Sequence, residues 1–213
     1  KAESMLRENP RKYWMPNQFT NTDNVQAHLK TTGPEIWEQT KGEIDCFVMS
    51  QGSGGTVTGV GRYLRTKSQK IKLYTVEPAE APIIADGRWG THKIEGIGDG
   101  FIPRNLDISI LDGVVTVSSE EAIEMTRRLA RLEGVFAGIS SGCNVAAAIK
   151  IARKHPELRK IVTLICDSGN RYLSTEAYGT GKKAVKIPER EHPLDEYTKQ
   201  QRELYASRLE VIR

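Results

Sequence analysis

Short apolar segments alternate with helical segments along the middle of this chain, and this alternation is the feature that most restricts its fold. Apolar and β-branched residues gather in four segments that predict strands, namely 44–49, 71–76, 114–117 and 161–166. Helices are predicted over the run that ends at Leu64, over 118–132 and over 141–154. Continuously apolar strands separated by helices are typical of a parallel sheet buried on both faces. The pattern therefore predicts an α/β domain with a parallel sheet flanked by helices.

Capping residues support the boundaries of two of these helices. Ser118 or Ser119 can cap the second helix, because a hydroxyl oxygen accepts a hydrogen bond from a free backbone N–H in the first turn. Gly134 stands where this helix should stop. The pair His155-Pro156 should end the third helix.

Composition narrows the class of protein. The 213 residues, 38% of them apolar, suffice for a sizeable core. The 31 basic and 27 acidic residues are interleaved, so we expect neither a nucleic-acid stripe nor a membrane patch. No segment approaches about 18 consecutive apolar residues, and we therefore expect a soluble protein. The chain has three cysteines, Cys46, Cys143 and Cys166. Because their number is odd and no pair has CxxC spacing, we expect neither a disulfide framework nor a metal site, which fits a reducing cytoplasm.

The chain divides into three parts. Residues 1–43 hold helical stretches without a complete βαβ unit, and we expect them to be the remnant of an amino-terminal domain and its crossover. Residues 44–179 carry the predicted sheet. Residues 180–213 combine a charged linker with one more helix. That helix packs either on the domain or on a partner subunit through an apolar side formed by Tyr197, Leu204, Tyr205, Leu209 and Ile212.

A glycine-rich segment, MSQGSGGTVTG at residues 49–59, follows the first predicted strand and opens the first predicted helix. Glycines without side chains let backbone N–H groups approach an anion, and neighbouring hydroxyls add donors. The residues in question are Gly52, Ser53, Gly54, Gly55 and Thr56. The same glycines could instead form a tight turn without a ligand. As a phosphate cradle, the segment suits a single phosphomonoester.

Two known nucleotide motifs do not match this segment. A triphosphate-binding loop needs a lysine followed by Ser or Thr after its last glycine, and Thr58-Gly59-Val60 stands there instead. A dinucleotide fingerprint needs a third glycine at the position that Val57 occupies.

Two further turns should reach the same edge of the sheet. GISSGCNVAAA begins a helix with Ser140 and Ser141, although it could be simply a capped helix. ICDSGNRYLST follows the last predicted strand and presents Cys166. Ligands in open α/β sheets bind at the carboxyl ends of the strands. The Gly- and Pro-rich segment 77–111 is predicted to wrap the rim of that site.

Six motifs, in order, resemble those of the cysteine synthases, also called O-acetylserine sulfhydrylases. They are QFTNTDNVQAHLKTTGPEIW, GSGGTVTGVGRYL, VEP, HKIEGIGDGFIP, GISSGCNVAAA and CDSGNRYLST. These enzymes use pyridoxal 5′-phosphate and have the tryptophan-synthase-β fold, called fold type II. The resemblance, which runs from about residue 1 to 175, implies that the chain contains the large carboxy-terminal domain of such an enzyme.

The resemblance also implies roles for individual residues. It makes residues 52–56 the cradle for the 5′-phosphate of the cofactor. It makes Ser140 the first candidate to meet the pyridine nitrogen and Cys166 the alternative. Because a hydroxyl does not keep that nitrogen protonated as a carboxylate would, elimination at the β-carbon is favoured over transamination. Gln18 would help to hold the substrate carboxylate. The loop 96–98 would line the open face of the cofactor, with Gly96 and Ile97 toward the substrate and Gly98 toward the cofactor.

The implied reaction is a β-replacement that forms L-cysteine from O-acetyl-L-serine and sulfide. The family carries its Schiff-base lysine in roughly the first third of its chain, and no lysine here stands in a comparable setting, so we expect this chain alone to be inactive. The resemblance further implies a homodimer and a possible partner, the tail of serine acetyltransferase. Two alternatives stay open: a cystathionine β-synthase type of reaction, and a non-catalytic module that binds phosphate or a partner protein.

Two departures from the family affect the choice of nucleophile. Asp99 stands where many cysteine synthases have a small residue, and an acid that faced inward would disfavour an anionic thiol such as homocysteine. A solvent-facing Asp99 would have no such effect. CDSGNRY replaces a Pro-Ser pair found in many relatives.

Overall fold

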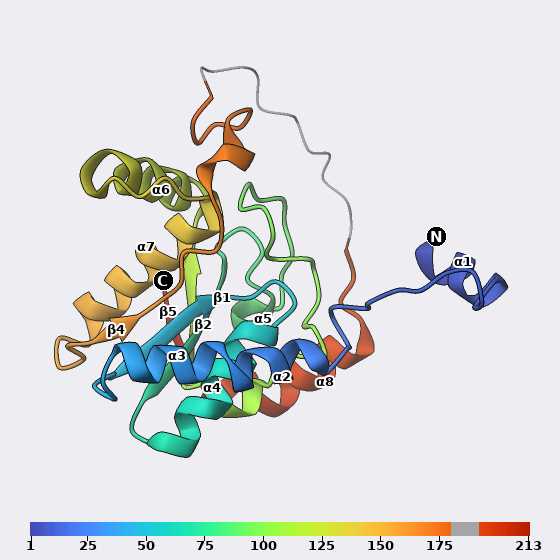
Figure 1. Ribbon diagram of the computed structural model, residues 1–213, viewed down its shortest axis with the longest axis horizontal. Coiled ribbons are helices and arrows are strands. Elements are labelled where there is room, and N and C mark those ends of the chain that lie inside the picture. The colour runs from blue at the N-terminus through green and yellow to red at the C-terminus, as the bar shows by residue number, and fades with distance from the viewer. Residues whose placement is uncertain (180–191) are drawn as a thin grey trace.

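The computed structural model describes residues 1–179 and 192–213, which form an α/β fold (Figure 1). Most of the predicted charged linker, residues 180–191, lies outside the described residues. Among the described residues, no helix is both long and apolar enough to cross a membrane.

The sheet has five strands in the order β4-β1-β2-β3-β5, and every neighbouring pair is parallel. The strands are β1 (Cys46–Ser50), β2 (Lys72–Pro78), β3 (Gly113–Val117), β4 (Ile161–Val162) and β5 (Glu210–Ile212). In the register, Val48 lies opposite Tyr74, and Val76 lies opposite Val115. Because the strands are parallel, the loops that leave β1, β2 and β3 all emerge at one edge. This confirms the predicted fold class.

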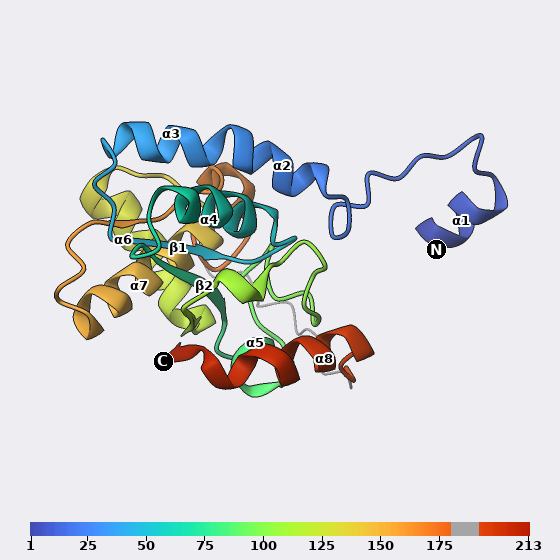
Figure 2. The same ribbon diagram turned by 90° about the horizontal axis from the view of Figure 1, so that it is seen from below.

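Helices cover both faces of the sheet (Figure 2). They are α1 (Ala2–Glu8), α2 (Asp23–Lys30), α3 (Thr32–Gln39), α4 (Gly55–Lys67), α5 (Ile83–Asp86), α6 (Ser119–Glu133), α7 (Ile139–Lys154) and α8 (Glu196–Tyr205). Short 3₁₀ turns span Ile108–Ile110, Gly169–Tyr172 and Ala206–Arg208. Side chains of α6 and α7 pack on one face, and those of α3, α4 and α8 contribute to the core on the other.

Alternation along the strands divides the core between these two faces. On β1, Val48 belongs to the cluster under α6 and α7, whereas Phe47 belongs to the cluster under α4. On β2, Val76 belongs to the cluster under α6 and α7, and Leu73 belongs to the cluster under α4. All four side chains are fully buried, as expected for a parallel sheet covered on both sides.

The predicted caps of α6 are confirmed. Ser118 Oγ accepts a hydrogen bond from the Glu121 N–H, and Glu121 Oε2 accepts one from the Ser118 N–H, which together form a capping box. Gly134 follows the helix with a left-handed φ of 68°.

The last predicted strand is shorter than expected. Only Ile161–Val162 pairs with β1, although the apolar run continues to Cys166. After Val162, hydrogen bonds from side chains take the place of backbone pairing between the strands. Thr163 Oγ1 donates to Val48 O at 2.7 Å, and the Asn144 amide donates to Leu164 O at 3.0 Å. The prediction of a strand over 161–166 was therefore wrong beyond Val162.

The carboxy-terminal helix also ends earlier than predicted. It stops at Tyr205. Ile212 lies in β5 and Leu209 directly before it, and β5 is a parallel edge strand next to β3. Ile212 is buried in the core, so its β-branched side chain packs better on the sheet than on a solvent-exposed helix. The Ile102 N–H donates to Thr198 Oγ1 at 2.9 Å, and α8 therefore packs on the domain.

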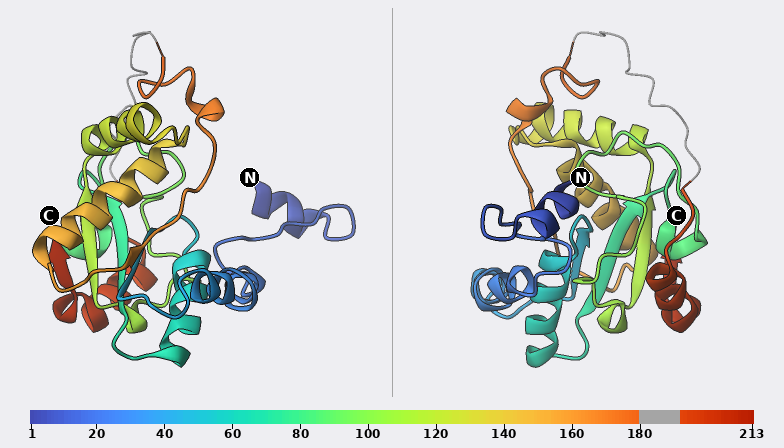
Figure 3. Two further views of the ribbon diagram at one scale, coloured as in Figure 1. Left: turned by 60° about the vertical axis from the view of Figure 1, so that its left-hand side comes forward. Right: turned by 90° about the vertical axis from the view of Figure 1, so that its right-hand side faces the viewer.

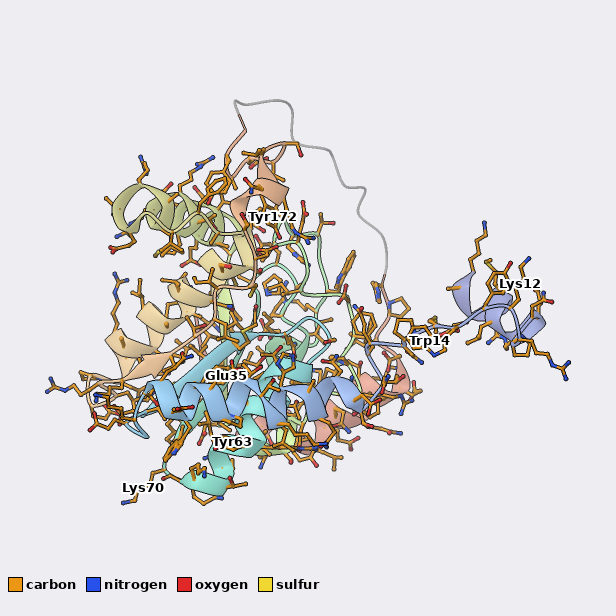
Figure 4. The ribbon with its side chains drawn as sticks, viewed as in Figure 1. Lys12, Trp14, Glu35, Tyr63, Lys70 and Tyr172 are labelled. Atoms are coloured by element: carbon orange, nitrogen blue, oxygen red, sulfur yellow. The ribbon has the colours of Figure 1, made fainter. Side chains whose placement is uncertain are left out.

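Residues 1–43 contribute to the domain unequally. Helix α2 lies directly on α4, where a Cβ on Gly59 would stand 2.5 Å from Val25 O. Helix α1 has no buried residue and projects on an arm away from the sheet (Figure 3). Trp14, on that arm, is 82% exposed, and Figure 4 places it beside Lys12 and away from the domain.

Glu210 anchors β5 to the body of the fold. It accepts hydrogen bonds from Tyr74 Oη at 2.6 Å and from His155 Nε2 at 2.9 Å, and it pairs with Lys154 Nζ at 2.8 Å. Partial burial alone would raise the pKa of Glu210, but the bonds from Lys154, Tyr74 and His155 outweigh it and lower the pKa to about 2.

We predict that Glu210→Gln lowers the free energy of unfolding by about 1 to 2 kcal/mol near pH 7. Because the pKa falls on folding, the stabilisation is present above the unfolded pKa of about 4.3. It is lost as the pH falls toward the folded pKa of about 2. Urea denaturation of both proteins from pH 7 to pH 3 measures the difference, which should shrink over the acidic range. A difference that stays constant with pH would contradict the assignment.

Candidate active site

A cleft of about 280 Å³ opens at the carboxyl ends of the strands. It brings together residues from four segments that are far apart in the sequence: the end of β1 and the loop after it, the loop after α5, the first turn of α7 and the segment after β4. The predicted site residues that line it are Gly52, Ser53, Gly54, Thr56, Gly96, Ile97, Ser140 and Cys166.

The glycine loop is shaped by close backbone packing. Gly54 has a left-handed φ of 81°, and a Cβ there would lie 2.8 Å from the Leu106 backbone nitrogen. A Cβ on Gly52 would lie 2.5 Å from Gly96 O, so the loop after β1 is held against the loop after α5. These two glycines are required by the conformation and by the close approach.

The amino-terminal end of α4 presents open backbone donors to the cleft. Gly54 occupies the N-cap position without a side-chain cap. The first N–H to bond inside the helix is that of Thr58, which donates to Gly54 O at 3.1 Å. The N–H groups of residues 55–57 thus lack an intrahelical acceptor, and the helix dipole adds partial positive charge at this end.

Neighbouring side chains hold the hydroxyls of the loop in place. The Asn24 amide donates to Ser53 Oγ at 2.9 Å. Thr56 Oγ1 lies 3.1 Å from His28 Nε2, and burial lowers the pKa of His28, so this imidazole is neutral at neutral pH. Helix α2 therefore orients both hydroxyls.

These residues fit a phosphate group. Free N–H donors, a helix amino-terminus and two hydroxyls at a glycine loop are the elements of phosphate recognition. In addition, Ser50 Oγ is buried beside the cleft and has no hydrogen-bond partner among the described residues.

Uncharged groups line the opposite side of the cleft. Ser140, in the first turn of α7, and Cys166 both line it, and the Ser140 hydroxyl lies close enough to the Cys166 thiol to lower the pKa of that thiol. Partial burial raises the pKa of Cys166, although bonds from Ser140, Ser141 and Asn144 partly offset this. The thiol is therefore neutral at neutral pH. Because Ser140 and Cys166 are neighbours, both predicted candidates face the same part of the cleft.

Asn144 ties the two sides of the cleft together. Its side-chain oxygen accepts a bond from the Ser50 N–H at 2.8 Å, at the end of β1. Its amide nitrogen donates to Leu164 O at 3.0 Å and lies 3.4 Å from Cys166 Sγ. The residue is fully buried, and a buried amide with these partners fixes the segments that it joins.

Asp167 and Tyr172 complete the wall next to Cys166. Tyr172 Oη donates to Asp167 Oδ2 at 2.8 Å, and burial together with this carboxylate raises the pKa of Tyr172. Asp167 Oδ1 is buried without a hydrogen-bond partner among the described residues. This oxygen lies against Gly138, where a Cβ would be 2.0 Å from it.

Three predicted site residues do not line the cleft. The Cα of Gly55 faces Asn24, where a Cβ would lie 2.0 Å from the amide oxygen, although its N–H belongs to the open donors. Gly98 packs against His92 and Pro78 and lines a separate hollow. The Gln18 side chain is exposed, and its backbone oxygen accepts bonds from two asparagine amides.

The sequence analysis missed residues that line the cleft, among them Met49, Glu95, Asp167 and Tyr172, and it missed Asn144, which is buried behind the cleft and bonds Ser50. A signal existed for Asn144, because an amide among the alanines of a helix core demands buried partners. Asp167 and Tyr172 lie inside a motif that the sequence singled out, but their direction depends on the fold. Among the described residues that line the cleft, none is a lysine.

Comparisons with known proteins agree with this geometry. The family described as pyridoxal-phosphate dependent enzyme matches residues 1–167. Cysteine synthase A of Escherichia coli (strain K12) is 47% identical over 187 residues, which cover 84% of this chain and 58% of that protein.

Solved structures of similar proteins superpose on the fold. The structure of cysteine synthase from Entamoeba histolytica matches with a TM-score of 0.79 at 38% identity, and covers 87% of this chain and 55% of its own. O-acetylserine dependent cystathionine beta-synthase from Helicobacter pylori matches with a TM-score of 0.75 at 40% identity. That match covers 82% of this chain and 57% of the other. The chain thus spans 58% or less of the length of these relatives.

We predict that Gly54→Ala destabilises the fold by more than Gly134→Ala does. Both positions have positive φ, but a Cβ at Gly134 meets nothing within 4 Å, whereas one at Gly54 meets Leu106 at 2.8 Å. We expect Gly134→Ala to lower the free energy of unfolding by about 1 kcal/mol, from backbone strain alone, and Gly54→Ala to lower it by at least about twice that amount. Chemical denaturation gives both values. Equal losses would show that the loop tolerates the side chain.

We predict that Asn144→Ala costs about 2 to 4 kcal/mol of stability, because it removes the partners of the buried Ser50 N–H and of the partly buried Leu164 O. Asn144→Asp keeps the acceptor for Ser50 and loses the donor to Leu164, so it should also destabilise. Thermal unfolding of both variants checks this, with Asn170→Ala as a control at an exposed asparagine. A variant at position 144 as stable as the control would rule out the bridging role.

Proposed function

Because the chain belongs to the family of pyridoxal-phosphate dependent enzymes, we propose that it forms the phosphate-binding part of an enzyme that makes L-cysteine from O-acetyl-L-serine and sulfide. The observation that carries this proposal is the cleft, in which open donors at the α4 amino-terminus face uncharged groups on α7 and at Cys166. The 47% identity to a cysteine synthase supports the choice of reaction.

In this proposal the glycine loop binds the phosphate of pyridoxal 5′-phosphate. The N–H groups of residues 55–57 and the hydroxyls of Ser53 and Thr56 are the donors. When bound, the cofactor supplies an electron sink for the carbanion formed at the α-carbon of the substrate. The residues of this chain position it and set the polarity around its ring.

The ring nitrogen of a bound cofactor would meet a neutral partner. Ser140 is our first candidate and Cys166 the second, and burial keeps the thiol of Cys166 protonated by raising its pKa. A hydroxyl or a thiol does not hold the nitrogen protonated as a carboxylate would, so loss of the β-substituent is favoured over transamination. Either assignment therefore supports a replacement at the β-carbon.

In this proposal the loop after α5 lies beside the substrate. Gly96 and Ile97 line the cleft, and the absence of a side chain at Gly96 would leave room for a substrate beside the cofactor ring. Gln18 and Gly98 lie outside the cleft, so a direct role for either requires a movement of its segment. The homodimer, the cytoplasmic location and the acetyltransferase tail as partner stay predictions.

A second reaction has support of its own. The match to an O-acetylserine dependent cystathionine β-synthase, at 40% identity, favours a thiol amino acid as an alternative nucleophile.

The test of the function uses the complete protein loaded with pyridoxal phosphate. We expect it to form cysteine from O-acetylserine and sulfide faster than cystathionine from O-acetylserine and homocysteine. Borohydride reduction makes the link between cofactor and lysine permanent, and peptide mapping should place that lysine outside residues 1–179. Preferred formation of cystathionine would favour the alternative, and a single label on a lysine within 1–179 would overturn the assignment.

We predict that Ser140→Asp raises the yield of transamination product relative to cysteine, because a carboxylate stabilises a protonated ring nitrogen. Ser140→Ala serves as the matched control and should leave that product ratio unchanged. Product analysis by mass spectrometry and near-ultraviolet spectra of the bound cofactor provide the measurement. If Ser140→Asp behaves like Ser140→Ala while Cys166→Asp changes the ratio, Cys166 is the partner of the ring nitrogen.

A further inference from the structure

Helix α2 lies beside α4 and directs two polar side chains toward it, those of Asn24 and His28 (Figure 2). The two residues stand four positions apart, so they lie one above the other on the same face of the helix. Helix α4 has glycines where they meet it. A Cβ on Gly59 would lie 2.7 Å from the His28 Cβ, and a Cβ on Gly55 would collide with the Asn24 amide. The helices therefore approach closely enough for both side chains to reach the glycine loop.

The bonds of Asn24 fix the direction of the Ser53 hydroxyl. The backbone oxygen of Gln18 can only accept a hydrogen bond, and Asn24 Nδ2 donates to it at 2.9 Å. The second proton of the same nitrogen goes to Ser53 Oγ, also at 2.9 Å. Ser53 Oγ is therefore an acceptor in this contact, and its own proton is left for another group. Among the described residues Ser53 Oγ has no other partner, and Ser53 lines the cleft.

The Thr56 hydroxyl belongs to a chain of three groups. Thr56 Oγ1 lies 3.1 Å from His28 Nε2, and Thr32 Oγ1 lies 2.9 Å from His28 Nδ1. Burial lowers the pKa of His28, so the imidazole carries a single ring proton at neutral pH. If that proton is on Nε2, it is donated to Thr56, and Thr32 donates to Nδ1. If it is on Nδ1, Thr56 must donate to Nε2 instead.

The two arrangements turn opposite ends of the Thr56 hydroxyl toward the cleft. A proton on Nε2 leaves the Thr56 O–H free to donate into the cleft, whereas a proton on Nδ1 leaves only oxygen lone pairs, which repel an anion. Among the described residues that line the cleft, none is a lysine, an arginine or a histidine. An anion there is met by uncharged donors, and the direction of each donor therefore affects how tightly it binds.

We propose that His28 does for Thr56 what Asn24 does for Ser53: it donates to the hydroxyl oxygen from Nε2, so that both hydroxyls donate to the phosphate. This inference rests on the proposed function, in which the glycine loop binds the phosphate of the cofactor. His28 is then a positioning residue that acts through Thr56. A fully ionised phosphate suits this loop, because each of its oxygens can accept a hydrogen bond and none has to donate one.

Nuclear magnetic resonance of the imidazole nitrogens shows directly where the proton lies. In the complete protein prepared with isotope-labelled histidine, we expect His28 Nε2 to carry the proton when pyridoxal 5′-phosphate is bound. His28→Gln assigns the signals, because only those of His28 disappear. A proton on Nδ1 in the loaded protein would overturn the proposal, since Thr56 would then donate to the imidazole.

Cofactor affinity separates this role from a merely structural one. We would titrate the complete protein, freed of cofactor, with pyridoxal 5′-phosphate and with pyridoxal, which lacks the phosphate, and follow the fluorescence. The His28→Asn side chain is too short to reach Thr56. It should weaken binding of pyridoxal 5′-phosphate by about threefold or more and leave that of pyridoxal unchanged. His28→Gln brings an amide N–H toward Thr56 and should restore the affinity.

A second substitution shows whether His28 acts through the hydroxyl. In a protein that already carries Thr56→Val, His28→Asn should have no further effect on affinity. Equal losses for both ligands, or a loss that persists beside Thr56→Val, would overturn the proposal. These measurements require no turnover, so a protein that shows the selective loss but makes no cysteine contradicts only the proposed reaction. An unmodified protein that binds both ligands equally would contradict the phosphate site itself, and this inference with it.

Discussion

The parallel register of the sheet is the constraint on which the cleft depends, because it brings the loops after β1 and β2 to one edge. Asn144 extends this constraint past the short β4 by bonding Ser50 at the end of β1 and Leu164 in the next segment. A single buried amide therefore sets the spacing between the glycine loop and Cys166. If that spacing changed, the donors of α4 and the hydroxyl of Ser140 would no longer face a common space.

The two ends of the cleft differ in their polar groups. The α4 amino-terminus supplies donors and partial positive charge, whereas Ser140 and Cys166 present an uncharged hydroxyl and thiol. A ligand with a phosphate next to an uncharged ring fits this arrangement in one orientation.

Local sequence patterns predicted those features of the fold that depend on residues near one another in the sequence. The strands of the sheet centre, the capping box at Ser118 and the glycine loop all follow from side-chain periodicity and backbone freedom. The strand at Ile212 was missed because its partner, β3, is distant in sequence. Gln18 and Gly98 were placed by resemblance, but the Gln18 side chain is exposed and Gly98 packs against His92 and Pro78 outside the cleft. Asn144 and Asp167 required knowledge of which segments the fold brings together.

The central claim is that the open amino-terminus of α4 binds the cofactor phosphate. A crystal structure of the complete protein with pyridoxal 5′-phosphate bound tests it most directly. We predict that the phosphate oxygens lie about 2.7 to 3.2 Å from the backbone nitrogens of residues 55–57 and from Ser53 Oγ or Thr56 Oγ1. A phosphate bound elsewhere, with the α4 amino-terminus facing only water, would contradict the account.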